Sequence, residues 1–553
     1  MAGETKQLLT SSSDALSQST DEAVSPSPSC NIVAGIAEAK GYETYHETRT
    51  SLEEENEEMD EQVEERFHQG LRRLVMVAAA TAATLGYDVG IMAAAIHPLQ
   101  ETMDLSSVQK ELAMGSLNFV AALGAVLGGK TANQHGRKYT VKVCCWIFVI
   151  GTLLMAGAPN YCVLLLGRIV TGMGVGVSFV VAPVYLSEVT PTDLRGRLNT
   201  VFDVAINGGI LLGYILGFLV QLIPDLEPRF KWRVMLGLGL VLPVIVLWNL
   251  KGLPESPRWL VMAGQTEAAR EVMRELGTCP SEIRKAVSSI EEELKQEEEY
   301  SSLEGSSQVS PSRLSPLNAV LRCRYSSGMK LAMALGFWQQ ITGTEAVLYY
   351  SADFLEKAGL ESPTQRLLGN CFVGFCKLTP ELIAMHWVDK VGRRPLMLAS
   401  AICLMVSTFF LSAAFLCDWS PLVVVTFLCL VMASFSIGLG PFSFLVASES
   451  LGLSERATGM TLCASINRCT SGTVALTAVS LYEWLGSGQL FALYGIIGAL
   501  SLPFYFMSLP ETTGQTLEEL AARNRELELQ KNANKSDNKC ASAPSEPTTG
   551  QFA

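Results

Sequence analysis

Twelve long apolar runs, separated by short polar loops, form the main pattern along the chain. A bilayer core about 30 Å thick requires about 20 mainly apolar residues per helix, which is close to the length of these runs. The pattern therefore predicts an all-α membrane protein with twelve transmembrane helices. The expected spans lie near residues 72–94, 112–132, 139–158, 162–186, 198–222, 232–252, 328–352, 366–388, 395–416, 421–449, 457–484 and 488–508.

The runs fall into two groups of six, with a polar and partly acidic stretch between them. Serine and glutamate dominate the first 66 residues, a composition typical of disordered segments. The expected organisation is a disordered acidic cytoplasmic tail (1–70), a first six-helix half (71–253), a cytoplasmic helical insert and linker (254–327), a second six-helix half (328–510) and a cytoplasmic C-terminal tail (511–553).

The two halves repeat the same motifs at matching places. Three pairs of motifs recur at a nearly constant offset of about 256 residues: 133–138 with 389–394, Glu188 and Arg195 with Glu449 and Arg456, and 254–257 with 510–512. Each half is therefore expected to be one copy of a six-helix unit. Parallel repeats of this kind place a substrate site near the membrane midplane, between the halves.

Composition and charge support a membrane protein and exclude other classes. Of 553 residues, 49% are hydrophobic and only 17% are charged, whereas soluble domains carry about 25% charged residues. The net charge is −13, and residues 1–70 supply most of it with 16 acidic and 4 basic residues. A nucleic-acid partner is excluded by the sign of the charge, and a small disulfide scaffold by the length.

Lysine and arginine in the short loops predict the orientation. With a cytoplasmic N-terminus, the inner loops hold nine basic residues and the outer loops five, which favours both tails inside. No apolar core lies near Met1, so we expect no cleaved signal peptide, and the first span after Arg72 and Arg73 should act as an uncleaved anchor.

The repeated cytoplasmic charges have two interpretations. They are positive-inside anchors, or acids at helix ends pair with bases of neighbouring loops and close the inner face until the halves rock apart. The matched spacing in both halves favours the second interpretation. The expected cytoplasmic gate comprises Gly136, Arg137, Glu188, Arg195, Glu255, Arg258, Asp389, Arg393, Arg394, Glu449, Arg456 and Glu511.

Over roughly residues 72–520 the chain resembles the sugar porters of the major facilitator superfamily. The motifs that carry this resemblance lie at 86–90, 167–172, 183–188, 195–196, 254–258, 339–340 and 510–512. A narrower resemblance to plant-type polyol and monosaccharide transporters rests on 85–92, 115–118, 206–207, 209–214, 434–441, 467–468 and 470–472. The resemblance implies the major facilitator fold, a cytoplasmic helical insert and alternating access, often driven by proton symport.

Asp88 and Arg168 are the expected proton-coupling pair. A charge in the middle of a span costs at least about 2.5–3.5 kcal/mol, so Asp88 should be protonated, paired or hydrated. Proton-coupled members of the resembling family carry an acid and an arginine at these two positions, and facilitative members usually lack the acid. The alternative is a static buried pair, which is a poor source of stability.

Several polar residues within the spans are expected to bind substrate. Amides donate and accept hydrogen bonds, and carboxylates accept them from vicinal hydroxyls, so both suit neutral polyols. For the acids at 203 and 345, the alternative is a charge-balancing pair with Lys377 or Arg468. The expected substrate-binding residues are Gln339, Gln340, Glu345, Asp203, Tyr349, Tyr350, Phe444 and Asn467.

Three of these expectations depend on the resemblance. Tyr349 and Tyr350 would close over the substrate as an outer gate, with an aromatic belt at the interface as the alternative. Phe444 stands where sugar porters generally have tryptophan, so the indole donor is missing. After Glu449 the usual proline and first arginine are also missing, which implies a looser or asymmetric inner gate.

The sequence thus predicts a proton-coupled symporter for a polyol or monosaccharide, acting as a monomer in the plasma membrane. A facilitative hexose or inositol transporter is the alternative, and a non-transporting sugar sensor is a more remote one. No metal spacing, nucleotide loop or nucleophile–base set is present in the sequence, so we expect no enzyme, no cofactor and no metal site. The expected partners are the substrate, protons and the lipid bilayer.

Overall fold

The computed structural model describes residues 42–189, 192–275, 283–292, 295 and 326–510 except 452. Within these ranges, the side chains of 42–68, 192–200, 389 and 453–457 lie outside the described part. Every regular element in the described ranges is helical. The chain divides into two units, Met1–His68 and Gln69–Ala553, and the membrane bundle belongs to the second.

The first half of the bundle begins with a helix that starts earlier than expected. Helix α3 runs from Tyr42 to Met103, so residues 42–66, expected as part of a disordered tail, are helical. This segment is rich in glutamate, a strong helix former, and its small number of hydrophobic residues hid that propensity. Only its portion Gln69–Met103 is apolar enough to cross a membrane.

The remaining helices of the first half follow the expected spans. They are α4 (Ser107–His135), α5 (Arg137–Ala156), α6 (Tyr161–Val189), α7 (Thr192–Gln221), and a sixth span built from α8 (Pro228–Gly237), η1 (Leu238–Leu240) and α9 (Val241–Leu250). The polar stretch that follows contains α10 (Pro257–Met262), α11 (Thr266–Glu275) and a further helical segment over 283–292.

The second half has two interrupted spans. Its helices are α14 (Ser327–Ile341), α15 (Thr344–Lys357), α16 (Pro363–Val391), α17 (Arg393–Leu416), α18 (Pro421–Ser436), α19 (Leu439–Ser450), α20 (Leu453–Leu485) and α21 (Ser487–Ser508). The seventh expected span is broken where Gly343 adopts a left-handed φ of 85°, a conformation that glycine reaches without steric cost. The tenth is broken between α18 and α19.

Ten helices in the described part are long and apolar enough to cross a membrane. They confirm ten of the twelve expected spans, and the other two correspond to the broken pair α14–α15 and to α20. Many large apolar side chains on these helices are exposed, among them Trp248 at 76%, Leu422 at 75% and Trp484 at 80%. Exposed apolar surface on this scale is not found on soluble monomers, and in a bilayer it faces lipid.

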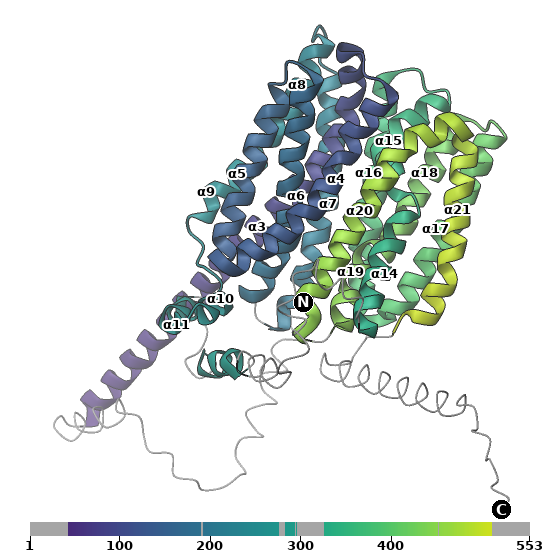
Figure 1. The fold of residues 1–553 in the computed structure, drawn as a ribbon. Coiled ribbons are helices and arrows are strands. Elements are labelled where there is room, and N and C mark those ends of the chain that lie inside the picture. The colour runs from purple at the N-terminus through teal and green to yellow at the C-terminus, as the bar shows by residue number, and fades with distance from the viewer. Residues whose placement is uncertain are drawn as a thin grey trace, which may run out of the picture. The chain divides into compact units, whose positions relative to one another are not determined.

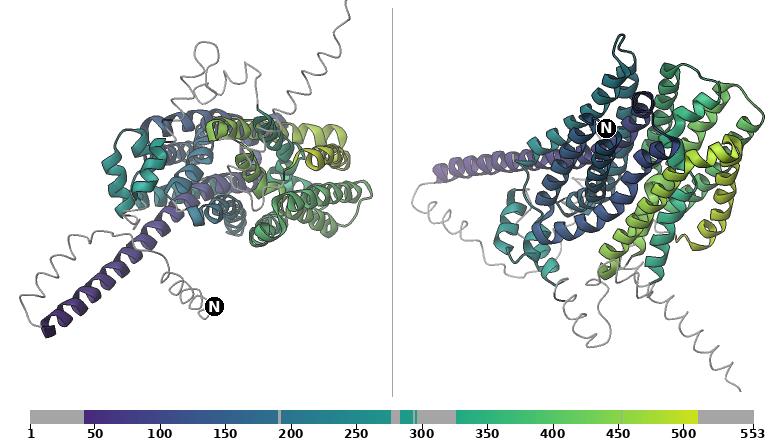
Figure 2. Two further views of the ribbon diagram at one scale, coloured as in Figure 1. Left: turned by 90° about the horizontal axis from the view of Figure 1, so that it is seen from below. Right: turned by 45° about the horizontal axis from the view of Figure 1, so that its top comes forward.

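Figure 1 shows the helices of the first half, in purple and blue, beside those of the second half, in green and yellow. The two most extensive contacts between the halves are those of α4 with α20 and of α7 with α16. Figure 2 shows the two halves from below and with the top of the bundle turned forward. The second and eleventh spans thus meet in the same way as the fifth and eighth, as a repeated six-helix unit requires.

The two halves have nearly the same backbone conformation in one pair of matching loops. Gly136, between α4 and α5, has φ 98° and ψ 165°, and Gly392, between α16 and α17, has φ 96° and ψ 157°. Both glycines end one helix and begin the next in a left-handed conformation that other residues rarely adopt. The sequence repeat therefore reflects a structural repeat.

Candidate functional site

The predicted pair of Asp88 and Arg168 forms in the core of the first half. The Nη1 of Arg168, on α6, donates to Oδ2 of Asp88, on α3, at 2.6 Å. Arg168 is fully buried and Asp88 is 6% exposed. The guanidinium also donates from Nε to the carbonyl of Ala113 at 2.8 Å and from Nη2 to that of Met114 at 3.4 Å. One arginine therefore connects three helices.

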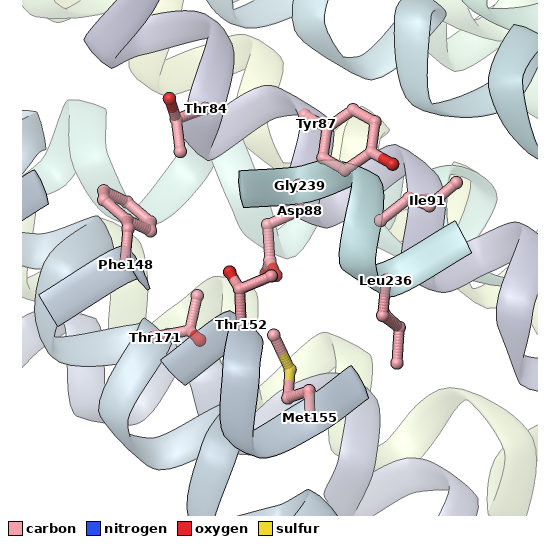
Figure 3. Close-up of a pocket in the computed structure, with 10 residues that line it drawn as sticks. All are labelled: Thr84, Tyr87, Asp88, Ile91, Phe148, Thr152, Met155, Thr171, Leu236 and Gly239. Carbon is pink, nitrogen blue, oxygen red and sulfur yellow. The ribbon is translucent and has the colours of Figure 1, made fainter. Parts of the chain in front are cut away.

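A small cavity lies beside this carboxylate. Its ten lining residues are labelled in Figure 3 and come from α3, α5, α6, α8 and η1, with Asp88 and Thr152 at its centre. Tyr87 also lines it and donates from its hydroxyl to the carbonyl of Met235 at 2.6 Å. Thr84, Thr152 and Thr171 give the cavity beside this carboxyl a partly polar lining.

The structure brings the predicted amide residues together in one network. Asn467, on α20, donates from Nδ2 to Oε1 of Gln339 at 2.6 Å, and its Oδ1 accepts from Nε2 of Gln340 at 3.4 Å. Arg468 donates to the same Oδ1 at 2.6 Å. Gln339 in turn donates to the carbonyls of Leu439 and Gly440, each at 2.9 Å.

This network keeps one buried acceptor free. Among the described residues, Oε1 of Gln340 has no hydrogen-bond partner, although its side chain is only 5% exposed. A buried amide oxygen without a hydrogen-bond partner destabilises the folded protein, and such an oxygen normally accepts a hydrogen bond from a ligand or water. Gln340 is therefore available to accept a hydrogen bond from a hydroxyl group.

Phe444 lies where the two halves meet. Its ring contacts that of Phe179 edge-to-face, with centroids 5.2 Å apart, and Phe179 also contacts Phe202 at 6.2 Å. The guanidinium of Arg468 lies 5.1 Å from the ring centre of Phe179. The expected aromatic platform is thus a cross-half cluster, and Phe179 and Phe202 were not anticipated.

The two tyrosines have different partners. The hydroxyl of Tyr350 donates to the carbonyl of Ala475 within the second half at 2.8 Å. The hydroxyl of Tyr349 instead accepts from Nδ2 of Asn118, in the first half, at 3.4 Å. Tyr350 also departs from helical geometry, with φ −119° and ψ 17°. The helix is therefore distorted where the first half contacts it.

The two acids proposed to contact substrate lie near a common lysine. Lys377, on α16, is 6% exposed and lies within electrostatic reach of Asp203, Glu345, Glu381 and Arg468. Glu345 is 7% exposed, and Asp203 is partly exposed. One lysine faces three acids, so it does not neutralise all of them. Charge balance with Lys377, the alternative interpretation, is therefore compatible with substrate contact by Asp203 or Glu345.

Sequence reasoning missed two groups that the structure places between the halves. Glu381 is 1% exposed and accepts a hydrogen bond from Asn207 of the first half. Asp353, on α15, lies 2.7 Å from Nζ of Lys110 and 3.2 Å from Nε2 of His97. A signal for the first was present, since Lys377 and Glu381 are four residues apart inside an apolar run, and intramembrane charges usually mark function.

The predicted cytoplasmic charges of the first half form a closed set of bonds. Arg137 donates from Nε and Nη2 to Glu188 at 2.7 and 2.8 Å. Glu255 accepts from the backbone N–H groups of Arg137 at 2.8 Å and of Lys138 at 3.0 Å. Ser256 joins the set by donating to Glu188 at 2.6 Å. The beginning of α5 is thus bound to α6 and to the segment after α9.

The second half shows the matching pair in looser form. Nη2 of Arg393 lies 3.7 Å from Oε1 of Glu449, and Arg394 donates to the carbonyl of Phe506 at 2.8 Å. Both contacts lie within one half. The predicted gate residue Arg258 lies on α10 and is partly exposed. The side chains of Arg195, Asp389, Arg456 and Glu511 lie outside the described part of the chain.

These features define a class of protein: a multi-pass membrane transporter with the major facilitator fold, built from two repeated halves around a buried polar centre. A model of the family described as Sugar (and other) transporter matches residues 74–523. The chain belongs to this family, which is one of transporters and not of enzymes.

Named relatives and solved structures agree. Probable polyol transporter 4 of Arabidopsis thaliana is 34% identical over 459 residues, covering 81% of this chain and 85% of that protein. Polyol transporter 5 of the same plant is 32% identical over 463 residues, covering 80% and 84%. The fold is similar to the xylose transporter XylE from E. coli in a partially occluded inward open conformation, with a TM-score of 0.68 and 24% identity over 81% of this chain and 100% of that one.

Proposed function

We propose that this protein is a proton-coupled symporter that carries a polyol or monosaccharide by alternating access. The observation that carries the proposal is the buried pair of Asp88 and Arg168, with its 2.6 Å contact beside a small cavity. A carboxylate in this position has to remain paired or take up a proton when its surroundings change. Support for the substrate class comes from the relatives named as polyol transporters.

The proton step follows from the contacts of the pair. Protonation of Asp88 removes its negative charge and weakens its bond to Arg168, while the bonds from Arg168 to Ala113 and Met114 on α4 remain. Helix α3 then becomes free to move relative to α4 and α6. A proton bound from the outside thereby changes the packing inside the first half.

Substrate binding belongs mainly to the second half in this proposal, and the first half contributes Asp203 on α7. The amides of Gln339, Gln340 and Asn467 offer both donors and acceptors to a neutral hydroxylated ligand. Glu345 and Asp203 accept from further hydroxyls, and Phe444 packs against the carbon skeleton. Tyr349 and Tyr350 close over the ligand from the outer side.

The inner charges act as the opposite gate. Arg137, Glu188 and Glu255 hold the inner ends of α4, α5 and α6 together, and Arg393 with Glu449 does so more loosely in the second half. The predicted roles of Gly136, Arg195, Arg258, Asp389, Arg394, Arg456 and Glu511 belong to this same proposal. We further infer a monomer in the plasma membrane with both tails in the cytoplasm.

The test is uptake of labelled sorbitol and labelled glucose into cells that lack native carriers, with the external pH recorded. We expect substrate to cause external alkalinisation, and Asp88→Asn to abolish accumulation while leaving exchange of labelled for unlabelled substrate. Asp104→Asn is the matched control, since it makes the same change at an exposed loop position. Uptake that does not depend on the proton gradient and is unchanged in Asp88→Asn would identify a uniporter instead.

A further inference from the structure

Glu381 is a buried carboxyl at the contact between the two halves. It lies on α16, is 1% exposed, and accepts a hydrogen bond at Oε2 from Nδ2 of Asn207, on α7 of the other half. Its second oxygen, Oε1, has no hydrogen-bond partner among the described residues. An ionised carboxylate has about four lone-pair sites to satisfy, so the surroundings observed here are poor for the charged form.

The charges around Glu381 do not balance. Lys377 lies one helical turn before it and is shared electrostatically by three acids, Asp203, Glu345 and Glu381. A second basic residue, Arg468, lies within electrostatic reach of Lys377. Arg468 donates to Asn467 and lies over the ring of Phe179. Even when Arg468 is counted with Lys377, the three acids outnumber the two bases. Asp88 and Arg168 neutralise each other by direct contact and are not part of this set.

Among the described residues, Lys377 is the one base within electrostatic reach of Glu381. Of the helices packed against α16, α7 contributes Asp203 and Asn207, α15 contributes Glu345, and α18 contributes Cys429, which lies beside Cys376 of α16. Because a surplus buried charge is unfavourable, a proton on one of the three acids would stabilise the state in which the halves are in contact. Asp203 is partly exposed and Glu345 is 7% exposed, whereas Glu381 is the most buried and has the unpartnered oxygen.

We propose that Glu381 is a second proton-binding carboxyl of the transport cycle, in addition to Asp88. This inference rests on the proposed proton-coupled function. Alternating access separates α7 from α16, which breaks the bond from Asn207 and hydrates Glu381. The carboxylate takes a proton from hydronium on the proton-rich side, the halves close over the neutral acid, and the proton passes to water on the opposite side.

The experiment measures how many protons accompany each substrate. Full-length protein is reconstituted into liposomes, and the membrane potential at which net flux of labelled sorbitol stops is measured at several pH gradients. Glucose and inositol serve as further probes. We expect Glu381→Gln to move one proton fewer per substrate than the wild type. The uptake rate of this variant should also depend on a lower power of the external proton concentration, so that it falls less steeply as the external pH rises. Glu361→Gln, an exposed acid in the preceding loop, is the matched control and should keep the wild-type ratio.

The possible outcomes separate this inference from the proposed function. A proton ratio of zero in the wild type would overturn both. A non-zero ratio that is unchanged in Glu381→Gln, with an unchanged pH profile, would overturn the role of Glu381 alone and leave it as a structural partner of Asn207. If Glu381→Gln loses substrate exchange altogether, Glu381→Asp serves as the second variant. It retains the carboxyl group and should show the wild-type ratio of protons to substrate. An active Glu381→Asp with a lower ratio would contradict the proposal.

Discussion

Lys110 and Asp353 form a buried ion pair between the two halves of the bundle. The Nζ of Lys110, near the start of α4, lies 2.7 Å from Oδ2 of Asp353 on α15, and each residue is 5% exposed. The Nε2 of His97 lies 3.2 Å from the other oxygen of the same carboxylate. Together with the contact from Asn118 to Tyr349, this pair joins the halves at the end of α4 that is expected to face outside.

Opening toward the outside should require this pair to separate. Asp353→Asn leaves the ammonium of Lys110 buried without its partner, and breaking a buried pair in this way typically costs about 3–5 kcal/mol. We expect the variant to be less stable by an amount of this order and to favour the outward-open form. The measurements are thermal unfolding in detergent and the rate at which an external thiol reagent labels a cysteine introduced at Gln340, in the polar centre.

Two further variants make this test specific. Asp225→Asn changes an exposed aspartate in an outer loop and should alter neither measurement. The double exchange Lys110→Asp with Asp353→Lys should recover part of the lost stability, because the charges still match. Equal labelling rates in the wild type and Asp353→Asn would show that the pair does not hold the outer side closed.

Arg168→Lys tests whether the shape of the guanidinium matters for coupling. A lysine ammonium is a compact charge that cannot contact Asp88 and the carbonyls of Ala113 and Met114 together, as the guanidinium fork does. A lost hydrogen bond to a charged group is worth about 1.5–3 kcal/mol, which corresponds to a rate reduction of about ten- to one-hundred-fold. We expect proton-driven uptake of labelled sorbitol to fall by this factor.

Arg233→Lys is the control for that change. Arg233, on α8, also donates to two backbone carbonyls, those of Arg229 and Ala158, but forms no ion pair with an acid among the described residues. Its replacement should leave uptake close to the wild-type rate. Wild-type uptake by Arg168→Lys would mean that a positive charge alone suffices beside Asp88.

Asn467 is the centre of the amide network, and its removal should affect substrate affinity most. In Asn467→Ala, Oε1 of Gln339 and the guanidinium of Arg468 both lose a buried partner. An unsatisfied buried group costs about 1–3 kcal/mol, so we expect the KM for substrate to rise about five- to one-hundred-fold. The KM is measured from initial uptake rates, and the expression of each variant is compared at the membrane.

A second variant separates shape from hydrogen bonding at this position. Asn467→Asp keeps the size of the side chain and the acceptor toward Arg468 but loses the donor to Gln339. It should also weaken binding. A KM unchanged in both variants would place the substrate elsewhere in the cavity.

The sequence predicted those parts of the fold that depend on local pattern. Apolar runs gave the spans, and the matched loops at Gly136 and Gly392 revealed the repeat because each half folds by the same local rules. Asp88 with Arg168 was found because a charge in the middle of an apolar span needs a partner, and because the resembling family carries an acid and an arginine at these two positions.

Contacts between the halves could not be found in the same way. The pairs of Lys110 with Asp353 and of Asn207 with Glu381 depend on which faces of α4, α7, α15 and α16 meet, and hydrophobic periodicity does not determine this when a helix is apolar on most sides. The break at Gly343 was also missed, because a single glycine inside an apolar run is common in membrane helices.

Gly136 is the position where a minimal substitution should disturb the inner gate. Its φ of 98° is unfavourable for any other residue by about 1–2 kcal/mol, and a Cβ there would lie 2.4 Å from Oε2 of Glu255. That carboxylate accepts from the backbone of Arg137 and Lys138, so Gly136→Ala should displace it and loosen the inner end of α5. We expect a lower Tm and slower uptake.

Gly264→Ala is the matched control for the backbone strain in Gly136→Ala. Gly264 also has a left-handed φ, 77°, but a Cβ at this position would meet no atom within 4 Å. Its replacement should therefore lower the Tm by the conformational cost alone and leave uptake unchanged. If Gly136→Ala and Gly264→Ala lower the Tm equally and neither slows uptake, then Glu255 is not needed to hold the inner gate, and the cytoplasmic charges act as positive-inside anchors.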